Sequence, residues 1–500
     1  MSRINTNVSS LLAQRVLGHQ NKTLTTSLER LSTGLAINRG ADNPAGLIAS
    51  ENLRSEKAAI SAAIGNAERA DQVVNIAEGG LQEISSLLLE VQSLVGETAN
   101  EAGLSDSERD ANQLQVDSIL QTIDRIAQST SFQGTKLLNG TYDFTISGQA
   151  TTVTDFTINA AKLAHGDTRN VQLVITGSAQ HGSLFVSAGA TALNLGGATS
   201  SFTFELAGAK GSREFSFASG TTLSAIAASI NTFKEVTGVS AVASGTYLEF
   251  KTTELGSEQF VSFDLIDEGG LTGGAVYSAS SLNEDAVATT TATAFSALTN
   301  PIRDAGRDVA LAINGLSTTA KGAEVRINTD FLDLAITLSE AGAQNLSTYT
   351  AFTITGGGAQ FNLGPKVDIT NQVSIGIENV TTRNLGHTSV GFLDDLGSGK
   401  TSNLVDGDLE TAQKIVDHSI AQVSDLRGRL GAFQRNVVAT TIRSLGVALE
   451  NTSAAESSIR DTDFAAETAS LTRSQILVQA ATNVLGIANA NPQNVLSLLG

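Results

Sequence analysis

The histidines and glycines of this 500-residue chain do not form a familiar catalytic or metal-binding pattern. None of the histidines has the HExxH spacing of a zinc peptidase, and they are scattered along the chain as His19, His165, His181, His387 and His418. The chain has no cysteine, which excludes disulfides, thiolate metal sites and a cysteine nucleophile. No GxxxxGKS or GxxxxGKT phosphate-binding loop is present. We therefore predict no catalytic, metal-binding or cofactor-binding residues, and no enzyme.

Paired carboxylates and glycine runs are the remaining candidates for ligand chemistry. The pairs Asp394/Asp395 and Asp406/Asp408 could bind a cation, but caps at helix N-termini and solvated loop ends explain them at least as well. The runs Gly269-Gly270 and Gly356-Gly357-Gly358 are more typical of turns than of phosphate cradles.

Composition narrows the class of protein further. Lys and Arg number 31 and Asp and Glu number 50, giving a net charge of −19, which argues against nucleic acid as the main partner. No run of 18 apolar residues exists, so we expect no membrane span. The first residues lack the apolar core of a secretory signal peptide, which predicts a cytoplasmic protein or export without a cleaved signal.

The two ends of the chain have a helical pattern. Apolar residues recur at alternating spacings of three and four from Leu24 to Leu35, from Leu53 to Val95 and from Leu409 to Val437. Each of these rows forms an apolar stripe, or seam, along one face of a helix, which is typical of coiled coils. We predict helix starts at Asn43-Pro44 and at the capping box Ser105–Glu108, a break near 451–460, and a last short turn after Asn491-Pro492. The residues assigned to subunit packing are Leu24, Leu28, Leu31, Leu35, Val74, Leu81, Ile84, Leu88, Val91, Val95, Val423, Leu426, Leu430, Phe433, Ile476, Val484 and Ile487. An intramolecular core between the N- and C-terminal helices is the alternative explanation for these seams.

The centre of the chain changes to the period of two that is typical of strands. All four Tyr and 16 of the 19 Phe lie between 141 and 400. Alternation predicts strands at 201–206, 213–217, 246–251 and 260–265, and one helix at 222–233 with Leu223, Ile226, Ala227 and Ile230 buried. The low-complexity stretch 286–299 is either a linker or an edge strand. The fold class is therefore α+β, with long terminal helices paired in a coiled-coil-like bundle and a β-rich region inserted between them.

The ends of the chain resemble bacterial flagellin. The resemblance rests on INTNVSSLLAQR (4–15), SLERLSTGLAINRGADNPAGL (27–47) and FQGTKLLNG (132–140), and on the run from SSIRDTDFAAETASLTRSQ to the final NVLSLLG (457–500). Within the centre, residues 211–251 resemble a ββαββ insert found in flagellins and hook-associated proteins. The resemblance implies a structural subunit that self-polymerises into the extracellular filament used for swimming and is exported unfolded by the flagellar type III apparatus. The hook–filament junction protein is the alternative, because it shares both termini.

The resemblance also implies a division into domains. Residues 1–43 with 460–500 are expected to form terminal inner-core helices. Residues 44–165 with 401–459 would form a helical rod domain with a β-hairpin near 132–146. Residues 166–400 would form the outer variable region, with one subdomain at about 190–295. We also expect both terminal segments to be disordered in the monomer and to fold only on assembly.

Expected partners follow from the same resemblance. They are other copies of the chain in a helical homopolymer, hook-associated junction and cap proteins, the export apparatus, and a secretion chaperone that wraps 463–499. Toll-like receptor 5 recognises many flagellins on the long helix, but this chain has Glu90 where well-recognised members have arginine, and Gln115 where they have glutamate. Because a carboxylate cannot replace the bidentate donors of arginine, we predict weak receptor activation, although Leu94 is retained. An enzyme carried on a filament scaffold has no motif in its favour, whereas an adhesive outer region could coexist with the filament role.

Overall fold

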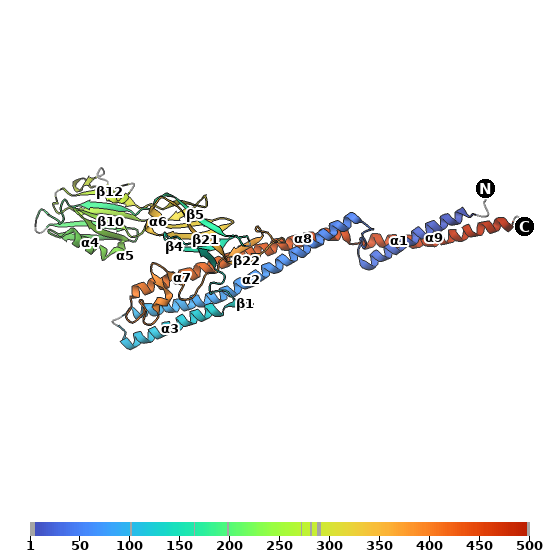
Figure 1. Cartoon of the computed structure of the whole chain (residues 1–500), viewed down its shortest axis with the longest axis horizontal. Coiled ribbons are helices and arrows are strands. Elements are labelled where there is room, and N and C mark those ends of the chain that lie inside the picture. The colour runs from blue at the N-terminus through green and yellow to red at the C-terminus, as the bar shows by residue number, and fades with distance from the viewer. Residues whose placement is uncertain are drawn as a thin grey trace. The chain divides into compact units, whose positions relative to one another are not determined.

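Long helices at both ends of the chain flank a β-rich centre, as the fold class predicted (Figure 1). The computed structural model describes residues 6–100, 103–164, 166–197, 200–271, 273–280, 283–287 and 292–497. The chain divides into two compact units. Unit 1 comprises Met1–Asp71, Asn362–Asn371 and Phe433–Gly500, and unit 2 comprises Gln72–Phe361 and Gln372–Ala432.

Unit 1 consists mainly of helices whose ends are set by local caps. Its helices are α1 (Val8–Thr33), the first half of α2 (Pro44–Thr98), a π-helical turn (Phe433–Val438), α8 (Ala439–Arg460) and α9 (Phe464–Ser497). The backbone N–H of Ser10 donates to the side chain of Asn7 over 3.0 Å, and α1 ends at Gly34, whose φ of +75° is the left-handed conformation that glycine tolerates. The predicted start at Asn43-Pro44 is confirmed, because Asn43 Oδ1 accepts from the N–H of Gly46 over 2.9 Å.

Two helix boundaries near the C-terminus differ from the prediction. The chain does not break at 451–460, since α8 continues to Arg460, and α9 then starts where Asp463 caps the N–H of Ala465 over 2.9 Å. No separate turn follows Pro492, because α9 continues to Ser497. Proline has no N–H, so it leaves the carbonyl four residues earlier without its helical donor. That carbonyl belongs to Ala488, and it accepts instead from the side-chain amide of Asn7 over 2.7 Å.

The helical part of unit 2 comprises the second half of α2, α3 (Asp106–Ser129) and α7 (Leu409–Ala432). The predicted capping box is confirmed, since Glu108 Oε2 accepts from the N–H of Ser105 over 2.7 Å and from its hydroxyl over 2.8 Å. Polar links join the helices: Arg427 Nε lies 2.9 Å from Glu78 Oε1, and Gln92 Nε2 donates to Asp417 Oδ1 over 2.7 Å. Short elements accompany them, namely β1 (Ser131–Phe132), β2 (Thr135–Lys136), β22 (Ala359–Asn362), β23 (Gln372–Ile375), β24 (Gly386–His387), β25 (Gly391–Phe392) and the 3₁₀ turn Leu393–Leu396.

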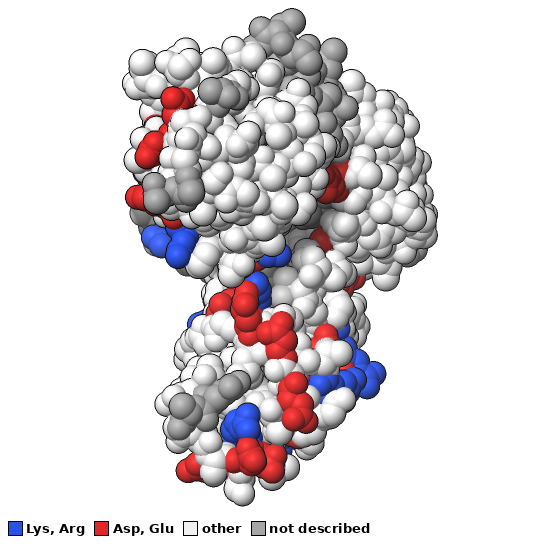
Figure 2. All heavy atoms as spheres, turned by 90° about the vertical axis from the view of Figure 1, so that its left-hand side faces the viewer, with Lys and Arg blue, Asp and Glu red and all other residues white. Residues whose placement is uncertain are grey.

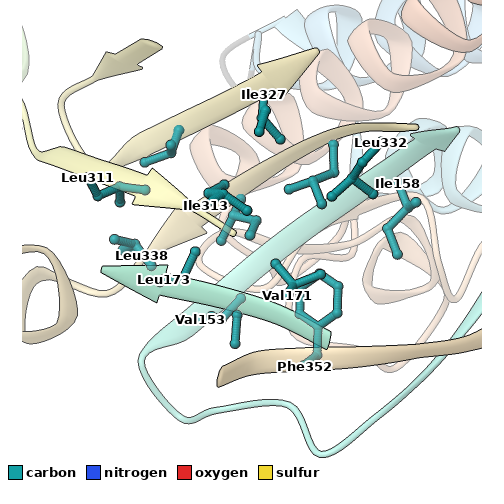
Figure 3. Close-up of a cluster of buried hydrophobic side chains, with 14 of the residues drawn as sticks. Val153, Ile158, Val171, Leu173, Leu311, Ile313, Ile327, Leu332, Leu338 and Phe352 are labelled. Atoms are coloured by element: carbon teal, nitrogen blue, oxygen red, sulfur yellow. The ribbon is translucent and has the colours of Figure 1, made fainter. Parts of the chain in front are cut away.

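The first β-sandwich of unit 2 encloses a mainly aliphatic core, which also holds the ring of Phe352 (Figure 3). One sheet has the strand order β17-β16-β5-β21-β3 and the other β18-β19-β20-β4. In β20, Leu332, Leu334, Ile336 and Leu338 alternate with less buried residues, which is the period that places one face of a strand in the core. The elements are β3 (Phe144–Ser147), β4 (Val153–Ala161), β5 (Arg169–Gly177), β16 (Ala310–Ile313), β17 (Leu316–Ser317), β18 (Thr319–Lys321), β19 (Glu324–Asn328), β20 (Leu332–Leu338), α6 (Glu340–Gln344) and β21 (Thr348–Gly357).

The second β-sandwich has a more aromatic core. Phe204 is fully buried, with ring centroids 5.0 Å from Phe263 and 6.0 Å from Phe250. Its sheets have the orders β13-β12-β6-β10-β9, with β14 also paired to β12, and β15-β11-β7-β8. The elements are β6 (Ser183–Ser187), β7 (Ser201–Gly208), β8 (Ser212–Ala218), α4 (Leu223–Asn231), α5 (Lys234–Thr237), β9 (Val239–Ser244), β10 (Tyr247–Thr252), β11 (Phe260–Asp267), β12 (Ala275–Ser280), β13 (Asn283–Val287), β14 (Thr293–Ala294), the 3₁₀ turn Phe295–Ala297 and β15 (Ile302–Ala305).

The four strands and the helix predicted in this region are confirmed, including the four buried positions of α4. The stretch 286–299 divides: β13 ends at Val287, residues 288–291 lie outside the described part, and β14 and a 3₁₀ turn follow. Figure 2 shows charges of both signs on the lower, helical part of that view, whereas most of its upper, β-rich part is uncharged. Among the described residues, none of the helices has the length and apolar character needed to span a membrane.

Candidate assembly surface

The predicted packing residues separate into a buried group and an exposed group. Along α2 and α7 they are buried within the chain, at 0–1% exposure for the nine positions Val74, Leu81, Ile84, Leu88, Val91, Val95, Val423, Leu426 and Leu430. Phe433 of unit 1 is buried too, at 7%. A side chain already inside the chain's own core offers no surface to another molecule. The intramolecular alternative therefore accounts for these positions.

The packing residues of α1 and α9 are different. Ile476, Val484 and Ile487 of α9 are 63%, 55% and 64% exposed, and Leu28 of α1 is 49% exposed. Leu24, Leu31 and Leu35 are half-buried. Large apolar side chains rarely gather on the surface of a soluble monomer unless something else covers them.

The contact between α1 and α9 is made of small residues. The side chains of this pair that are buried are Ser10, Ala13 and Ser27 on α1 and, up to residue 490, Ser474, Ala481 and Ala488 on α9. Polar links fix the register: Ser10 Oγ donates to Asn489 Oδ1 over 2.7 Å, and Arg30 lies 3.7 Å from Glu467. Alanine and serine bring the helices close, but they bury little apolar area, so this pair gains little hydrophobic stabilisation by itself.

A hollow of about 500 Å³ lies between the two helices. Its lining is almost entirely aliphatic and consists of Ser9, Leu12, Ala13, Val16, Gln20, Leu477, Ala480, Ala481, Val484, Ile487 and Ala488. Leu12 is 51% exposed and Val16 is 43% exposed, so α1 contributes to the same apolar surface as α9. Leu12 and Val16 were not among the predicted residues, although their spacing of four on one helical face was a signal that could have identified them.

The receptor-type positions come together across α2 and α3. Gln115 Nε2 donates to Glu90 Oε1 over 3.1 Å, so the two residues at which the sequence predicts a departure from the receptor-type site are hydrogen-bonded to each other. Leu94 is only 6% exposed and belongs to the core. Leu89 and Leu114 are apolar residues nearby that remain accessible, at 54% and 68% exposure.

The other candidates for chemistry have structural roles in the described part of the chain. Asp408 caps the start of α7, accepting from the hydroxyl of Thr411 over 2.7 Å, and this hydrogen bond is the main cause that lowers the pKa of Asp408. Asp395 accepts from the N–H of Phe392 over 2.9 Å, and Asp394 pairs with Lys400 at 3.2 Å. The glycine runs have the positive φ values that turns require, such as +89° at Gly357. No group of three metal-ligating side chains occurs among the described residues.

Comparison with known proteins identifies the family. The bacterial flagellin N-terminal helical region matches residues 4–143, the C-terminal helical region matches 413–499, and the flagellin hook IN motif matches 201–254. The flagellin of Salmonella rubislaw is 30% identical over 516 residues, and the B-type flagellin of Pseudomonas aeruginosa is 30% identical over 528 residues. In each case the match covers 99% of this chain and 99% of the relative.

The fold of this chain has only a slight similarity to the solved structures that match it. The flagellar cap protein of Escherichia coli has a TM-score of 0.27 and 16% identity, over 55% of this chain and 64% of that chain. The hook–filament junction alternative receives no better support than the filament subunit. With flagellin relatives over its full length, this chain belongs to the bacterial flagellin family, the structural proteins that polymerise into the extracellular filament used for swimming.

Proposed function

We propose that this flagellin polymerises through the exposed apolar faces of α1 and α9, with the buried seam of α2 and α7 serving as each subunit's own core. The single observation that carries this assignment is the contrast in burial between two sets of the predicted packing residues. Leu81, Ile84 and Leu88 are 0% exposed, whereas Ile476 and Ile487 are more than 60% exposed. Only the second set gains free energy when another subunit covers it.

The energetics of the α1–α9 pair support folding on assembly. Ordering a residue costs about 1–2 kcal/mol in backbone entropy, and a seam of alanine and serine offsets little of that cost. We therefore propose that α1 and α9 fray in the free monomer and become fixed only when neighbouring subunits bury their outer faces. Rapid hydrogen exchange of the amides in α1 and α9 of the free monomer, with protection in the filament, is the expected result. Protection already present in the monomer would contradict this proposal.

The arrangement of the domains in the filament belongs to the same proposal. Residues 1–43 with 460–500 would line the inner tube, residues 44–165 with 401–459 would form the next shell, and residues 166–400 would face outward. The partly exposed face of α9 also suits a secretion chaperone, because an amphipathic helix that lacks a cover fits the groove of a partner. Hook-associated junction and cap proteins would contact the two ends of the polymer. A structural role of this kind needs no catalytic residue.

Seeded assembly of the purified chain tests the proposal. Monomer is concentrated with a precipitating salt in the presence of short filament seeds and examined by electron microscopy. Long tubes are expected from the intact chain, and none from chains that lack residues 1–40 or 461–500. Shortened chains that still elongate seeds would refute the role of the termini. An intact chain that elongates no seed would favour the junction protein over the filament subunit.

A further inference from the structure

Three positions of the chain place an asparagine or aspartate directly before a glycine, which is the arrangement that forms a cyclic imide most readily. They are Asn139-Gly140, Asn314-Gly315 and Asp406-Gly407. In such a pair the backbone nitrogen of the glycine attacks the side-chain carbonyl carbon of the residue before it, because glycine has no side chain to obstruct the approach. The local structure around each pair decides whether this reaction can take place in the folded chain.

Two of the three pairs are held away from this reaction. The N–H of Gly407 donates to the carbonyl of Asn403 over 3.0 Å, so the proton that the nitrogen must lose is already bound. Asn314 is anchored to β5 of the first sandwich, since its Oδ1 accepts from the N–H of Gln172 over 2.9 Å and its own N–H donates to the carbonyl of Gln172 over 2.9 Å. Its side chain cannot turn toward Gly315 without breaking a contact with that strand.

Asn139 has no anchor of this kind among the described residues. Its Oδ1 accepts from the N–H of Thr141 over 3.2 Å and from the hydroxyl of Thr141 over 2.7 Å. These hydrogen bonds to the residue two positions on fold the side-chain amide back along its own turn. The N–H of Gly140 donates to no acceptor in the described part of the chain. The attacking nitrogen is therefore free, and the carbonyl oxygen beside it is bound by two donors.

We propose that Asn139-Gly140 is a site of spontaneous deamidation, which the Thr141 donors promote. The nitrogen of Gly140 loses its proton to hydroxide and bonds to Cγ of Asn139. Negative charge then develops on Oδ1, and the N–H and hydroxyl of Thr141 stabilise it as an oxyanion hole does.

The remaining steps need only water. The bond between Cγ and Nδ2 of Asn139 breaks, and Nδ2 leaves as ammonia after taking a proton from water, which gives a five-membered imide. Water then adds to one of the two imide carbonyls and opens the ring. Opening at one carbonyl gives aspartate, and opening at the other gives isoaspartate, in which the main chain runs through the former side chain. The net reaction consumes one water molecule and releases one ammonia molecule.

The site lies in a neck that joins the helical part of unit 2 to the first sandwich. The neck consists of residues 138–142, where the chain approaches β3, and residues 377–380, where it returns after β23. The two passes pair on both sides of Asn139-Gly140, since the N–H of Val380 donates to the carbonyl of Leu138 over 3.1 Å and the N–H of Ile377 donates to the carbonyl of Tyr142 over 3.0 Å.

Isoaspartate does not fit this neck without a rearrangement. It adds one carbon to the main chain between the two paired points and leaves a carboxylate where the amide was. The passes are already close at this place, because a Cβ at Gly140 would lie 3.2 Å from the Cβ of Asn379. The reaction therefore loosens the attachment of the β-rich region. It depends on the single chain alone, so it stands apart from the proposed polymerisation.

Timed incubation of the intact, purified monomer in mildly alkaline buffer tests the proposal, with the urea-unfolded chain as the reference. Trypsin separates the three pairs into the peptides 137–162, 308–321 and 401–414, since each peptide follows and ends at a Lys or Arg. Mass spectrometry with fragmentation measures deamidation at each asparagine, and an isoaspartyl methyltransferase detects isoaspartate at all three pairs. Dividing each rate by the rate in the unfolded chain removes the effect of the local sequence.

Asn139 is expected to react in the folded chain at least as fast as in the unfolded chain. Asn314 and Asp406 should react roughly tenfold more slowly than in the unfolded chain, because they must first open locally. Thr141→Val should slow the reaction of Asn139 by roughly tenfold, and Thr141→Ser, which keeps the hydroxyl, should react at the native rate. Equal folded-to-unfolded ratios at Asn139 and Asn314, or a Thr141→Val variant that reacts as fast as Thr141→Ser, would overturn the proposal.

Hydrogen exchange tests the effect on the neck. The amides of Ile377 and Val380, which donate across it, should exchange faster in the isoaspartate-containing fraction than in fresh protein. Unchanged exchange at both amides would overturn the inferred loosening.

Discussion

Replacing Ile476, Val484 and Ile487 together by alanine should weaken filament assembly without weakening the subunit. The three side chains are 63%, 55% and 64% exposed in the chain, so most of their apolar surface is still available for burial. Complete burial of a Val or Ile side chain contributes ~1.5–3 kcal/mol, and about 60% of that remains to be gained at each position. Alanine retains a methyl group, which leaves a loss of about 1 kcal/mol for each position and about 3 kcal/mol for the three.

A loss of about 3 kcal/mol for each added subunit raises the critical concentration for elongation by roughly 100-fold, since 1.4 kcal/mol is a tenfold change. The stability of the monomer should not decrease. Alanine has a higher helix propensity than isoleucine or valine, so α9 is at least as favourable in the variant. Thermal unfolding of the monomer is expected to match that of the native chain.

The assay is seeded elongation, in which the protein that remains in the supernatant after sedimentation gives the critical concentration. The matched control is Val242→Ala with Ile266→Ala, two apolar residues of the second sandwich that are 55% and 54% exposed. This control should elongate at the native critical concentration. An unchanged critical concentration in the triple variant would refute the assignment of this face to assembly. An equal increase in the control would show that the effect is not specific to α9.

Three further predictions concern the interior, the pH response and the receptor. Leu81→Ala should lower the free energy of unfolding, measured by chemical denaturation, by roughly 2–5 kcal/mol, because Leu81 is 0% exposed and alanine leaves a cavity. The control is Leu28→Ala, since Leu28 is 49% exposed. A smaller loss in Leu81→Ala than in Leu28→Ala would contradict the burial described for the seam. Burial raises the pKa of Asp143 to about 6, so the folded state binds the proton more tightly than the unfolded state. This group therefore destabilises the fold increasingly as the pH rises from about 4 to about 6, and by a constant amount above that. Asp143→Asn should raise the melting temperature at pH 8 and leave it nearly unchanged at pH 4, whereas a gain confined to acidic pH would reverse the sign of this reasoning. The native monomer should activate toll-like receptor 5 reporter cells weakly, and the Glu90→Arg variant should activate them more strongly, because arginine adds hydrogen-bond donors that the Glu90 carboxylate lacks. A native response as strong as that of a well-recognised flagellin would exclude this explanation.

Local signals in the sequence were sufficient to place most elements. The start of α2 follows from an Asn-Pro pair, the start of α3 from a Ser-to-Glu capping box, and the buried face of α4 from residues 223, 226, 227 and 230. Each of these signals acts within one or two turns of the chain. These elements could therefore be predicted without knowledge of any distant part of the chain.

The continuation of α9 past Pro492 could not be predicted from local signals. The local signal predicted a new cap, but the carbonyl that proline leaves without a helical donor is satisfied by Asn7, 481 residues from Ala488 along the chain. Likewise, nothing near His181 in the sequence indicates that its ring lies between Glu254 and Glu340.

The spacing of the leucine, isoleucine and valine residues determined that both ends of the chain are amphipathic helices, because helical periodicity is a property of the local chain. It did not determine which stripes are covered. Val91 and Val484 occupy seams of the same kind, yet one is 0% and the other 55% exposed. Only the tertiary structure decided this, because burial depends on which distant segments pack against a helix. The second half of α2 has α3 and α7 in its own unit, whereas α9, over the described residues, packs mainly on the small-residue face of α1.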